Sequence, residues 1–272
     1  VLSTLFASAF AANAQRSIGI VHDTPEAAAT NQLDIPISDC AGQTFIFLEK
    51  PKLLQKFGYI GLRLTKDQTW YQAKSELEVN FGDLRYEKFV GKRIKVISVE
   101  TSTANSFEYL VTFLEESNNL TIYADSYKEF IDGIAPAGDL EKAKNRWLGK
   151  TIWTKQTSIN TYDAEKDKYG EVKTSIGDPL KVMDVWFGHE STRPIWLIVE
   201  TKDKQQGYLA IAYSWTDIYK DWWKDYHPWE DAFFETDPKQ LGWSDEAWAK
   251  IRDGKVVVGM TKPQVILSWR RP

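Results

Sequence analysis

Alternation of hydrophobic and polar positions is clearest in two pairs of strand-forming segments. In the first pair, residues 107–113 place large side chains at every second position, and 120–123 follows after a short polar stretch. In the second pair, 195–201 and 208–215 flank a polar stretch in the same way. Period-two alternation on both sides of a short polar turn is typical of antiparallel strands. The sequence therefore predicts two β-hairpins.

Three segments begin with a glycine and one or two polar residues and continue with strand-forming residues. Their glycines, Gly42, Gly91 and Gly149, are 49 and 58 residues apart, a spacing that fits one small β unit each. We therefore expect strands to start just after each glycine, in a mainly β chain of tandem small antiparallel barrels. The expected bounds of the three modules are 41–89, 90–137 and 148–216.

The segments outside the modules have different patterns. Residues 15–40 contain turn formers and two prolines without a sustained period, so they are predicted to be an extended lead-in. Residues 138–147 are polar with charges of alternating sign, which predicts a helical linker capped by Asp139. Residues 217–272 are predicted to be a Trp-rich helical C-terminal segment.

Aromatic and aliphatic residues after position 215 recur at the spacing of one helix face. They are Trp215, Ile218, Tyr219, Trp222, Trp223 and Tyr226. Pro228 ends this helix. Two shorter helices are predicted beyond it. The first has Ser244 as N-cap between the staple residues Trp243 and Trp248, and the second has a capping box formed by Thr261 and Gln264.

Composition changes along the chain. Of the twelve tryptophans, only Trp70 precedes residue 147. Residues 49–95 contain eleven Lys or Arg and six Asp or Glu, whereas residues 215–246 contain three and nine. Neither half has the dense basic stripe that nucleic-acid binding needs, so no nucleic-acid partner is expected.

The first fourteen residues are apolar and small, and Ala12-Asn13-Ala14 before Gln15 fits the cleavage rule of a secretory signal. We therefore expect residues 1–14 to be the remnant of a signal peptide and the protein to be periplasmic or secreted. No later stretch approaches the ~20 apolar residues of a membrane-spanning helix, so no transmembrane span is expected.

Few residues suggest catalytic chemistry. Cys40 is the only cysteine, which excludes an internal disulfide and a thiolate metal cluster, and a buried thiol is expected. Of the three histidines, His22 and His189 have no partner at a defined spacing, which favours solvated side chains for both. No phosphate-binding loop, dinucleotide fingerprint or nucleophile elbow is present. The sequence predicts a protein that is not an enzyme and has no cofactor and no metal.

One cluster leaves an alternative open. Asp221, Asp225, Glu230 and Asp231 offer carboxylates around His227, and paired carboxylates could hydrolyse a glycan or bind a metal. Burial of the aromatic stripe already accounts for the helix, which favours a core helix with a solvated polar side.

The same cluster could bind a ligand without catalysis. Two neighbouring tryptophans on a helix point about 100° apart, so burial along one stripe leaves one of them near its margin. Together with Trp229 they predict an apolar platform with an anionic rim, suited to sugars or to peptides with a positive charge. The candidate ligand-binding residues are Trp222, Trp223, Tyr226, Trp229, Asp225 and Glu230. The alternative is that these rings belong to the core.

Two resemblances can be stated on these residues. A glycine-led strand, a long loop and a returning hairpin are similar to bacterial SH3-like β-barrel modules. Residues 251–269, with Gly259-Met260-Thr261 and Gln264-Val265, resemble the helix-turn-helix segment of the SmpA/OmlA (BamE-like) outer-membrane assembly lipoproteins. Both resemblances imply binding and bring no catalytic residues. We therefore expect an exported cell-envelope binding or scaffold protein whose partner is a cell-wall glycan or peptide, or an envelope protein. An envelope glycan hydrolase is the alternative.

Overall fold

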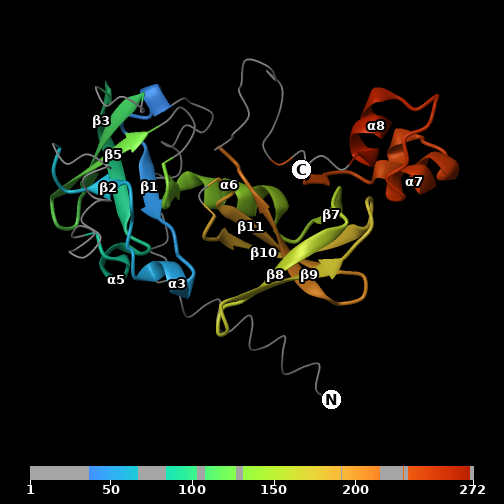
Figure 1. Ribbon diagram of the computed structural model, residues 1–272, viewed down its shortest axis with the longest axis horizontal. Coiled ribbons are helices and arrows are strands. Elements are labelled where there is room, and N and C mark those ends of the chain that lie inside the picture. The colour runs from blue at the N-terminus through green and yellow to red at the C-terminus, as the bar shows by residue number, and fades with distance from the viewer. Residues whose placement is uncertain are drawn as a thin grey trace.

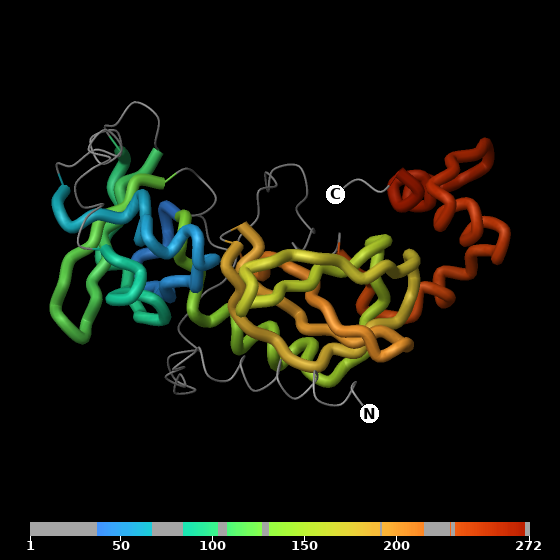
Figure 2. The backbone as a smooth tube through the Cα atoms, turned by 60° about the horizontal axis from the view of Figure 1, so that its bottom comes forward, coloured from blue at the N-terminus to red at the C-terminus, as the bar shows by residue number. Residues whose placement is uncertain are grey.

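The computed structural model is mainly β, with two antiparallel sheets followed by a pair of helices (Figures 1 and 2). It describes residues 37–66, 84–102, 108–126, 131–190, 192–214, 229 and 232–269. The two sheets lie next to each other along the long axis, and the C-terminal helices form a third body at the far end (Figure 2).

The first sheet contains six strands in the order β2-β5-β4-β3-β1-β6. These are β1 (Thr44–Phe47), β2 (Leu62–Arg63), β3 (Arg93–Thr101), β4 (Tyr109–Glu115), β5 (Leu120–Ser126) and β6 (Ile134–Pro136). The hairpin predicted at 107–113 and 120–123 is confirmed as β4 and β5, which pair antiparallel from Tyr109 with Ser126 to Glu115 with Leu120.

The second sheet contains seven strands in the order β13-β7-β10-β11-β12-β8-β9. These are β7 (Thr151–Thr154), β8 (Ser158–Asp163), β9 (Lys168–Lys173), β10 (Pro179–Phe187), β11 (Ile195–Thr201), β12 (Gln206–Ile211) and β13 (Phe233–Phe234). The second predicted hairpin is confirmed as β11 and β12. The β8–β9 hairpin, which places β9 at the edge of the sheet, was not predicted.

The helices of the described residues are short. They are η1 (Ile37–Asp39), α3 (Lys52–Gln55), α5 (Tyr86–Phe89), α6 (Gly138–Trp147), η3 (Pro238–Leu241), α7 (Asp245–Arg252) and α8 (Lys262–Ser268). Helix α6 confirms the helix predicted at 138–147, and it packs on β10 of the second sheet (Figure 1).

The two sheets repeat one topology, strand for strand. The order β2-β5-β4-β3-β1-β6 corresponds to β8-β12-β11-β10-β7-β13, with β9 added at the edge. The registers agree as well, because Phe45 opposes Ile94 in the first sheet as Ile152 opposes Leu180 in the second. The equivalent strands β3 and β10 also both carry a register shift, which follows Val96 in β3 and Val182 in β10. The chain therefore contains two copies of one β unit.

Backbone hydrogen bonds outside the ladders repeat in the same way. The Gly42 N–H donates to the Val96 carbonyl at 2.8 Å, and the Gly149 N–H donates to the Val182 carbonyl at 3.0 Å. The N–H of Gly91 donates to Phe47 and that of Gly177 donates to Thr154, at 3.0 and 2.7 Å. Gly149 is thus the counterpart of Gly42, whereas Gly91 corresponds to Gly177.

This correspondence corrects the prediction of three tandem modules. Strands do begin just after Gly42, Gly91 and Gly149, but the strand after Gly91 pairs with β1 in the same sheet. The boundary predicted between 89 and 90 therefore runs through one unit. The local pattern could not reveal this, because all three glycines have φ between 75° and 86° and precede a strand. In each unit, a glycine with positive φ precedes two different strands. These are β1 and β3 in the first unit, and β7 and β10 in the second.

The core of each unit lies on one face of its sheet and uses the same positions in both copies. In the first core, Phe45, Ile94, Val96, Val111 and Phe113 are each at most 3% exposed. Their counterparts in the second core are Ile152, Leu180, Val182, Leu197 and Val199, each at most 1% exposed. Alternate positions along each strand supply these side chains, as the period of a strand requires.

Several local predictions change in detail. Asp139 does not cap α6, because the N-cap is Ala137 and Asp139 lies in the first turn. The fully buried Asp139 carboxylate instead accepts hydrogen bonds from the Ser214 N–H at 3.1 Å and the Ser214 hydroxyl at 2.6 Å. In the first unit, the stretch between β1 and β3 contains the short helix α3 and then the two-residue strand Leu62–Arg63.

The two C-terminal helices confirm their predicted signals. The Ser244 hydroxyl accepts a hydrogen bond from the Ala247 N–H at 3.2 Å, and the Trp243 and Trp248 rings lie 5.0 Å apart. The Thr261 N–H donates to Gln264 Oε1 at 2.8 Å. The thiol of Cys40 is buried as expected, and burial raises its pKa to about 12. Across the described ranges, no helix has both the length and the apolar character to cross a membrane.

Candidate ligand-binding site

The outer face of the second sheet, opposite its core, carries a row of aromatic side chains. Trp186 on β10 opposes Trp196 on β11, and Tyr162 on β8 opposes Tyr169 on β9. Directly opposed residues of an antiparallel pair share a face, so each pair presents its rings together. Tyr208 joins them from β12, between β11 and β8.

These rings pack against one another across neighbouring strands, and the outermost ring lies on the edge strand β9. Trp196 and Tyr208 are stacked, with centroids 3.8 Å apart and planes 13° from parallel, and they are only 4% and 3% exposed. Tyr162 lies beside them on β8, with its ring centroid 6.1 Å from that of Trp196 and 5.0 Å from that of Tyr169. Tyr169 is half exposed. The cluster therefore has a covered base and an open outer ring.

The loop after β10 closes one side of this cluster. A Cβ atom on Gly188 would lie 2.1 Å from the Trp196 ring, so only glycine allows the backbone to approach this closely. The neighbouring His189 ring then packs 4.7 Å from Trp196, 5.0 Å from Tyr162 and 5.6 Å from Tyr169.

His189 is hydrogen bonded through Nε2 to the Tyr169 hydroxyl. Burial lowers the pKa of His189 to about 4, against a smaller opposing effect of Asp167. The imidazole is therefore neutral at pH 7. The expectation of a solvated His189 is wrong, because the β8–β9 hairpin brings an aromatic wall against it.

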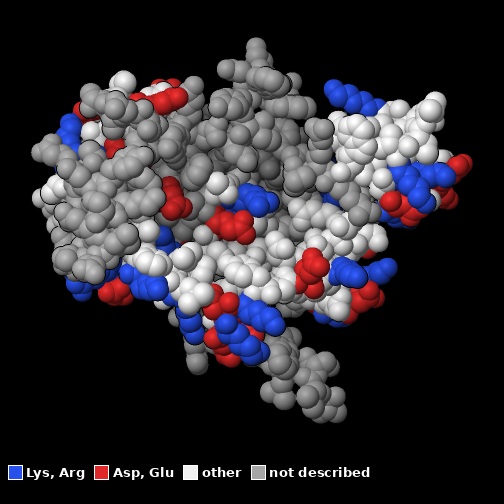
Figure 3. All heavy atoms as spheres, viewed as in Figure 1, with Lys and Arg blue, Asp and Glu red and all other residues white. Residues whose placement is uncertain are grey.

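A carboxylate at the turn of the hairpin holds the cluster against the first unit. Asp167 Oδ1 accepts a hydrogen bond from the Tyr162 hydroxyl at 2.6 Å, while its Oδ2 accepts one from the Leu53 N–H at 3.3 Å. Burial, and then the hydrogen bond to Asp167, raise the pKa of Tyr162. Lys52 of α3 also donates to the Glu165 carbonyl at 3.1 Å. Charged side chains gather around this contact in Figure 3.

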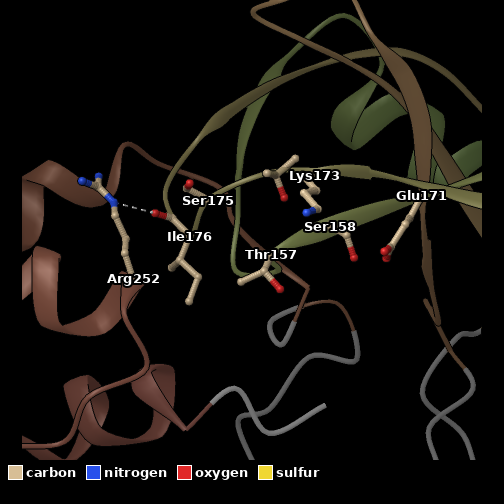
Figure 4. Close-up of a pocket in the computed structure, with 8 residues that line it drawn as sticks. Thr157, Ser158, Glu171, Lys173, Ser175, Ile176 and Arg252 are labelled. Carbon is tan, nitrogen blue, oxygen red and sulfur yellow. Dashed lines mark hydrogen bonds between the residues drawn. The ribbon is translucent and has the colours of Figure 1, made fainter.

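A polar pocket of about 360 Å³ lies beyond the other end of the same hairpin. Its lining residues are Thr157, Ser158, Glu171, Lys173, Thr174, Ser175, Ile176 and Arg252. Arg252 comes from α7, and its Nε donates to the Ile176 carbonyl at 3.3 Å. Figure 4 shows Arg252 and Glu171 on opposite sides of the pocket, with Ser158 and Lys173 between them.

The pocket and the aromatic cluster share one face of the hairpin. Ser158 opposes Lys173, and two residues along each strand Asn160 opposes Glu171. A further two residues along, Tyr162 opposes Tyr169. Positions two apart on a strand point to the same side, so these three pairs form one continuous strip. We call the six residues of these pairs the hairpin strip.

The first unit keeps one ring of this row at the equivalent positions and lacks the two tryptophans, because Tyr208 corresponds to Tyr123 whereas Trp186 corresponds to Glu100. Trp196 corresponds to Leu110, and Ala210 corresponds to Asp125. Asp125 is paired with Arg63 at 2.7 Å, with both side chains mostly buried. The two copies thus keep one core and differ on the outer face, which indicates that the aromatic face is not required by the shared fold.

The site predicted from the Trp-rich helix lies largely outside the described residues. This applies to Trp222, Trp223, Asp225, Tyr226 and Glu230, and also to the carboxylates Asp221 and Asp231 of the hydrolase alternative.

Trp229 is the one predicted site residue that the structure describes, and its ring is 4% exposed. It packs 5.1 Å from Trp147, and its Nε1 donates to Glu235 Oε1 at 2.8 Å. The guanidinium of Arg146 lies 4.7 Å from the same ring. Trp229 therefore belongs to the second core, which was the alternative stated for these rings.

The sequence did not predict the hairpin strip, because β8 and β9 lack a regular alternation of apolar and polar residues. Only Ile159 is fully buried among the residues of β8 and β9. A usable signal was present, however. Two tyrosines, Tyr162 and Tyr169, flank the mostly charged run 163–168, whose two aspartates are turn formers.

No group of three or more His, Cys, Asp or Glu side chains suited to a metal ion occurs in the described ranges. No protein-family model, curated protein or solved structure shows significant similarity to the chain.

Proposed function

We propose that the protein is an exported cell-envelope binding protein that holds a glycan chain on the outer face of its second sheet. The observation that carries the proposal is the hairpin strip, which places the exposed Tyr169 ring, the partly exposed Tyr162 ring and a polar pocket in line. A tyrosine ring offers a flat apolar face and one polar atom, a combination that suits the apolar face and hydroxylated edge of a sugar. The export part rests on the signal-like pattern of residues 1–14.

The pocket favours binding over hydrolysis. Its lining includes one carboxylate, Glu171, whereas most glycosidases use two carboxyl groups on either side of the bond. Hydroxyl groups dominate the remaining lining, and they can both donate to and accept from sugar hydroxyls. A pocket of about 360 Å³ lies within the range of roughly 300–1,000 Å³ typical of small-ligand sites.

We also propose that each unit is an SH3-like barrel. In the first unit β1 lies between β3 and β6, and in the second β7 lies between β10 and β13. Strands β3-β4-β5 and β10-β11-β12 each form a meander. A long connection contains a strand that pairs with the last strand of each meander. In the connection from β1 to β3, β2 pairs with β5, and in the connection from β7 to β10, β8 pairs with β12. This arrangement supports the assignment, and it places the β8–β9 hairpin in that long connection.

Co-sedimentation with insoluble envelope and wall polysaccharides tests the proposal. The purified protein would be incubated with chitin, cellulose and bacterial sacculi, the last both intact and stripped of peptides by an amidase. We expect binding to at least one polysaccharide, and removal of the peptides should leave binding to sacculi unchanged. Loss of binding with the peptides would identify a peptide ligand and contradict the proposal.

Two exposed aromatic residues provide a matched pair of variants for this assay. Tyr169→Ala removes the outer ring of the hairpin strip and should weaken binding about tenfold, as loss of a central contact residue does. Trp269→Ala removes a ring that is 57% exposed at the end of α8 and should leave binding unchanged. Equal binding by both variants would contradict the proposed site.

A further inference from the structure

Charges are distributed unevenly along the hairpin strip. The Tyr162–Tyr169 end carries neutral rings, the middle pair contributes Glu171, and the far pair contributes Lys173. In the part of the chain that the structure describes, Lys173 has no ion-pair partner. Its ammonium group is therefore available to a ligand that occupies the pocket.

The pocket as a whole carries a positive charge. Lys173 and Arg252 contribute two positive charges and Glu171 contributes one negative charge, which leaves a net charge of +1. The hydroxyl groups of Thr157 and Ser158 make no hydrogen bond to any residue of the described ranges, so they can donate to an anion beside Lys173. A charge-assisted hydrogen bond from Lys173 would be the strongest contact of such an anion.

Glu171 sets the order of groups on the ligand. Its carboxylate only accepts hydrogen bonds at neutral pH, so it favours sugar hydroxyls and repels a second anion. It lies between the tyrosine pair and Lys173. The ligand group nearest the rings is therefore neutral, and the anionic group lies at the far end.

The length of the strip sets a minimum size. Tyr162 lies four residue steps along β8 from Ser158, and a strand rises about 3.3 Å per residue, so the two ends of the strip are about 13 Å apart. A single sugar ring cannot span that distance. An oligosaccharide can contact both ends.

From this arrangement we propose that the ligand is an acidic oligosaccharide with a neutral sugar ring on the Tyr162–Tyr169 platform and a carboxylate beside Lys173, as uronic or sialic acids supply. This inference rests on the proposed function and adds the class of glycan to it.

A glycan array that contains uronic-acid and sialic-acid oligosaccharides next to their neutral parent oligosaccharides tests the inference. The wild-type protein should bind acidic members about tenfold more tightly than their neutral parents. Lys173→Gln should reduce binding to the acidic members to the level of the neutral ones. Glu171→Gln, which removes the opposing charge, should retain the acidic preference.

Lys168→Gln is the matched control. Lys168 lies on the same strand and is also exposed, but it is an odd number of residues from Lys173 and projects from the opposite face. Its substitution should leave both kinds of binding unchanged, and an effect as large as that of Lys173→Gln would overturn the inference.

The outcomes separate the two proposals. Equal binding of acidic and neutral glycans by the wild type, with loss of both in Tyr169→Ala, would overturn the acidic class and leave the glycan site in place. An acidic preference that persists in Lys173→Gln would overturn the role of Lys173. No binding to any glycan would overturn the proposed function itself.

Discussion

Tyr162 and Tyr169 stand opposite each other on β8 and β9 with ring centroids 5.0 Å apart, and Tyr169 is half exposed. The neighbouring rings on β11 and β12, Trp196 and Tyr208, are almost completely covered. The hairpin therefore closes a second, smaller apolar cluster on the outer face and leaves one tyrosine ring available to solvent. The counterpart of this hairpin in the first unit includes β2, which carries the ion-paired Arg63.

Equivalent glycine substitutions test the internal duplication. Gly91 and Gly177 occupy the same turn in the two units, with φ of 75° and 87°. A Cβ atom would meet nothing within 4 Å at Gly91 and only ordinary contacts at Gly177. Each change to alanine should therefore cost about 1–2 kcal/mol, from the left-handed backbone alone. Urea denaturation measures this, and a cost confined to one position would argue against equivalence.

The pH dependence of stability should reveal the partly buried His189. Its pKa falls from the ordinary 6.5 to about 4 on folding, so the unfolded state binds more protons between these values. Stability should decrease as pH falls from 6.5 to 4, and His189→Gln should remove this part of the decrease. Urea midpoints of both proteins across this range measure the difference, and parallel profiles would contradict it.

Glu190→Gln supplies an opposite control for the same titration. Burial raises the pKa of Glu190, and the neighbouring Arg193 partly offsets this. The native state then binds more protons than the unfolded state just above the ordinary pKa. The contribution of Glu190 to stability should therefore be present at low pH and be lost as pH rises, the reverse of the His189 effect.

The tryptophan predicted as a ligand platform should behave as a core residue. Trp229 is 4% exposed and packs on Trp147, so Trp229→Ala should lower stability by about 3–5 kcal/mol. Trp269→Ala, at a position 57% exposed, should change stability far less. Thermal and urea denaturation of the two variants decide this, and equal stability would contradict the packing of Trp229.

The loop that closes the aromatic cluster should tolerate no side chain at its glycine. Gly188→Ala would force the Cβ atom into the Trp196 ring, so Trp196 or the loop must shift. We expect a measurable loss of near-ultraviolet circular dichroism from the displaced tryptophan and weaker glycan binding. Gly42→Ala is a control for a glycine with open space around its Cβ position. An unchanged spectrum in Gly188→Ala would contradict the packing described.

Much of the fold could be predicted from periodicity and capping residues. The hairpins of β4 with β5 and of β11 with β12 have alternating apolar positions because one face of each is the core. Ser244 and Gln264 form local hydrogen bonds that their sequence spacing already encodes. Where a local contact decides the structure, the local sequence was sufficient.

The duplication and the site depend on contacts that are distant along the chain. The strand after Gly91 pairs with β1, which is about 50 residues earlier in the chain. The residues near Gly91 therefore do not indicate whether this strand begins a new unit or completes the first one. The hairpin strip lies at the edge of its sheet, where little apolar burial shapes the pattern. His189 lies in a loop twenty residues after Tyr169 in the sequence and contacts it only because the fold brings the two together. The surroundings of His189 could therefore not be predicted from the residues next to it.

Amide chemical shifts test the central claim, that the outer face of the second sheet binds glycan, most directly. The ¹⁵N-labelled protein would be titrated with soluble oligosaccharides released from the polysaccharide that co-sediments with it. We predict shifts concentrated in 158–163, 168–173 and 188–190, with the equivalent face of β4 and β5 unchanged. Shifts confined to β4, β5 or the C-terminal helices, with the β8–β9 hairpin unaffected, would contradict the claim.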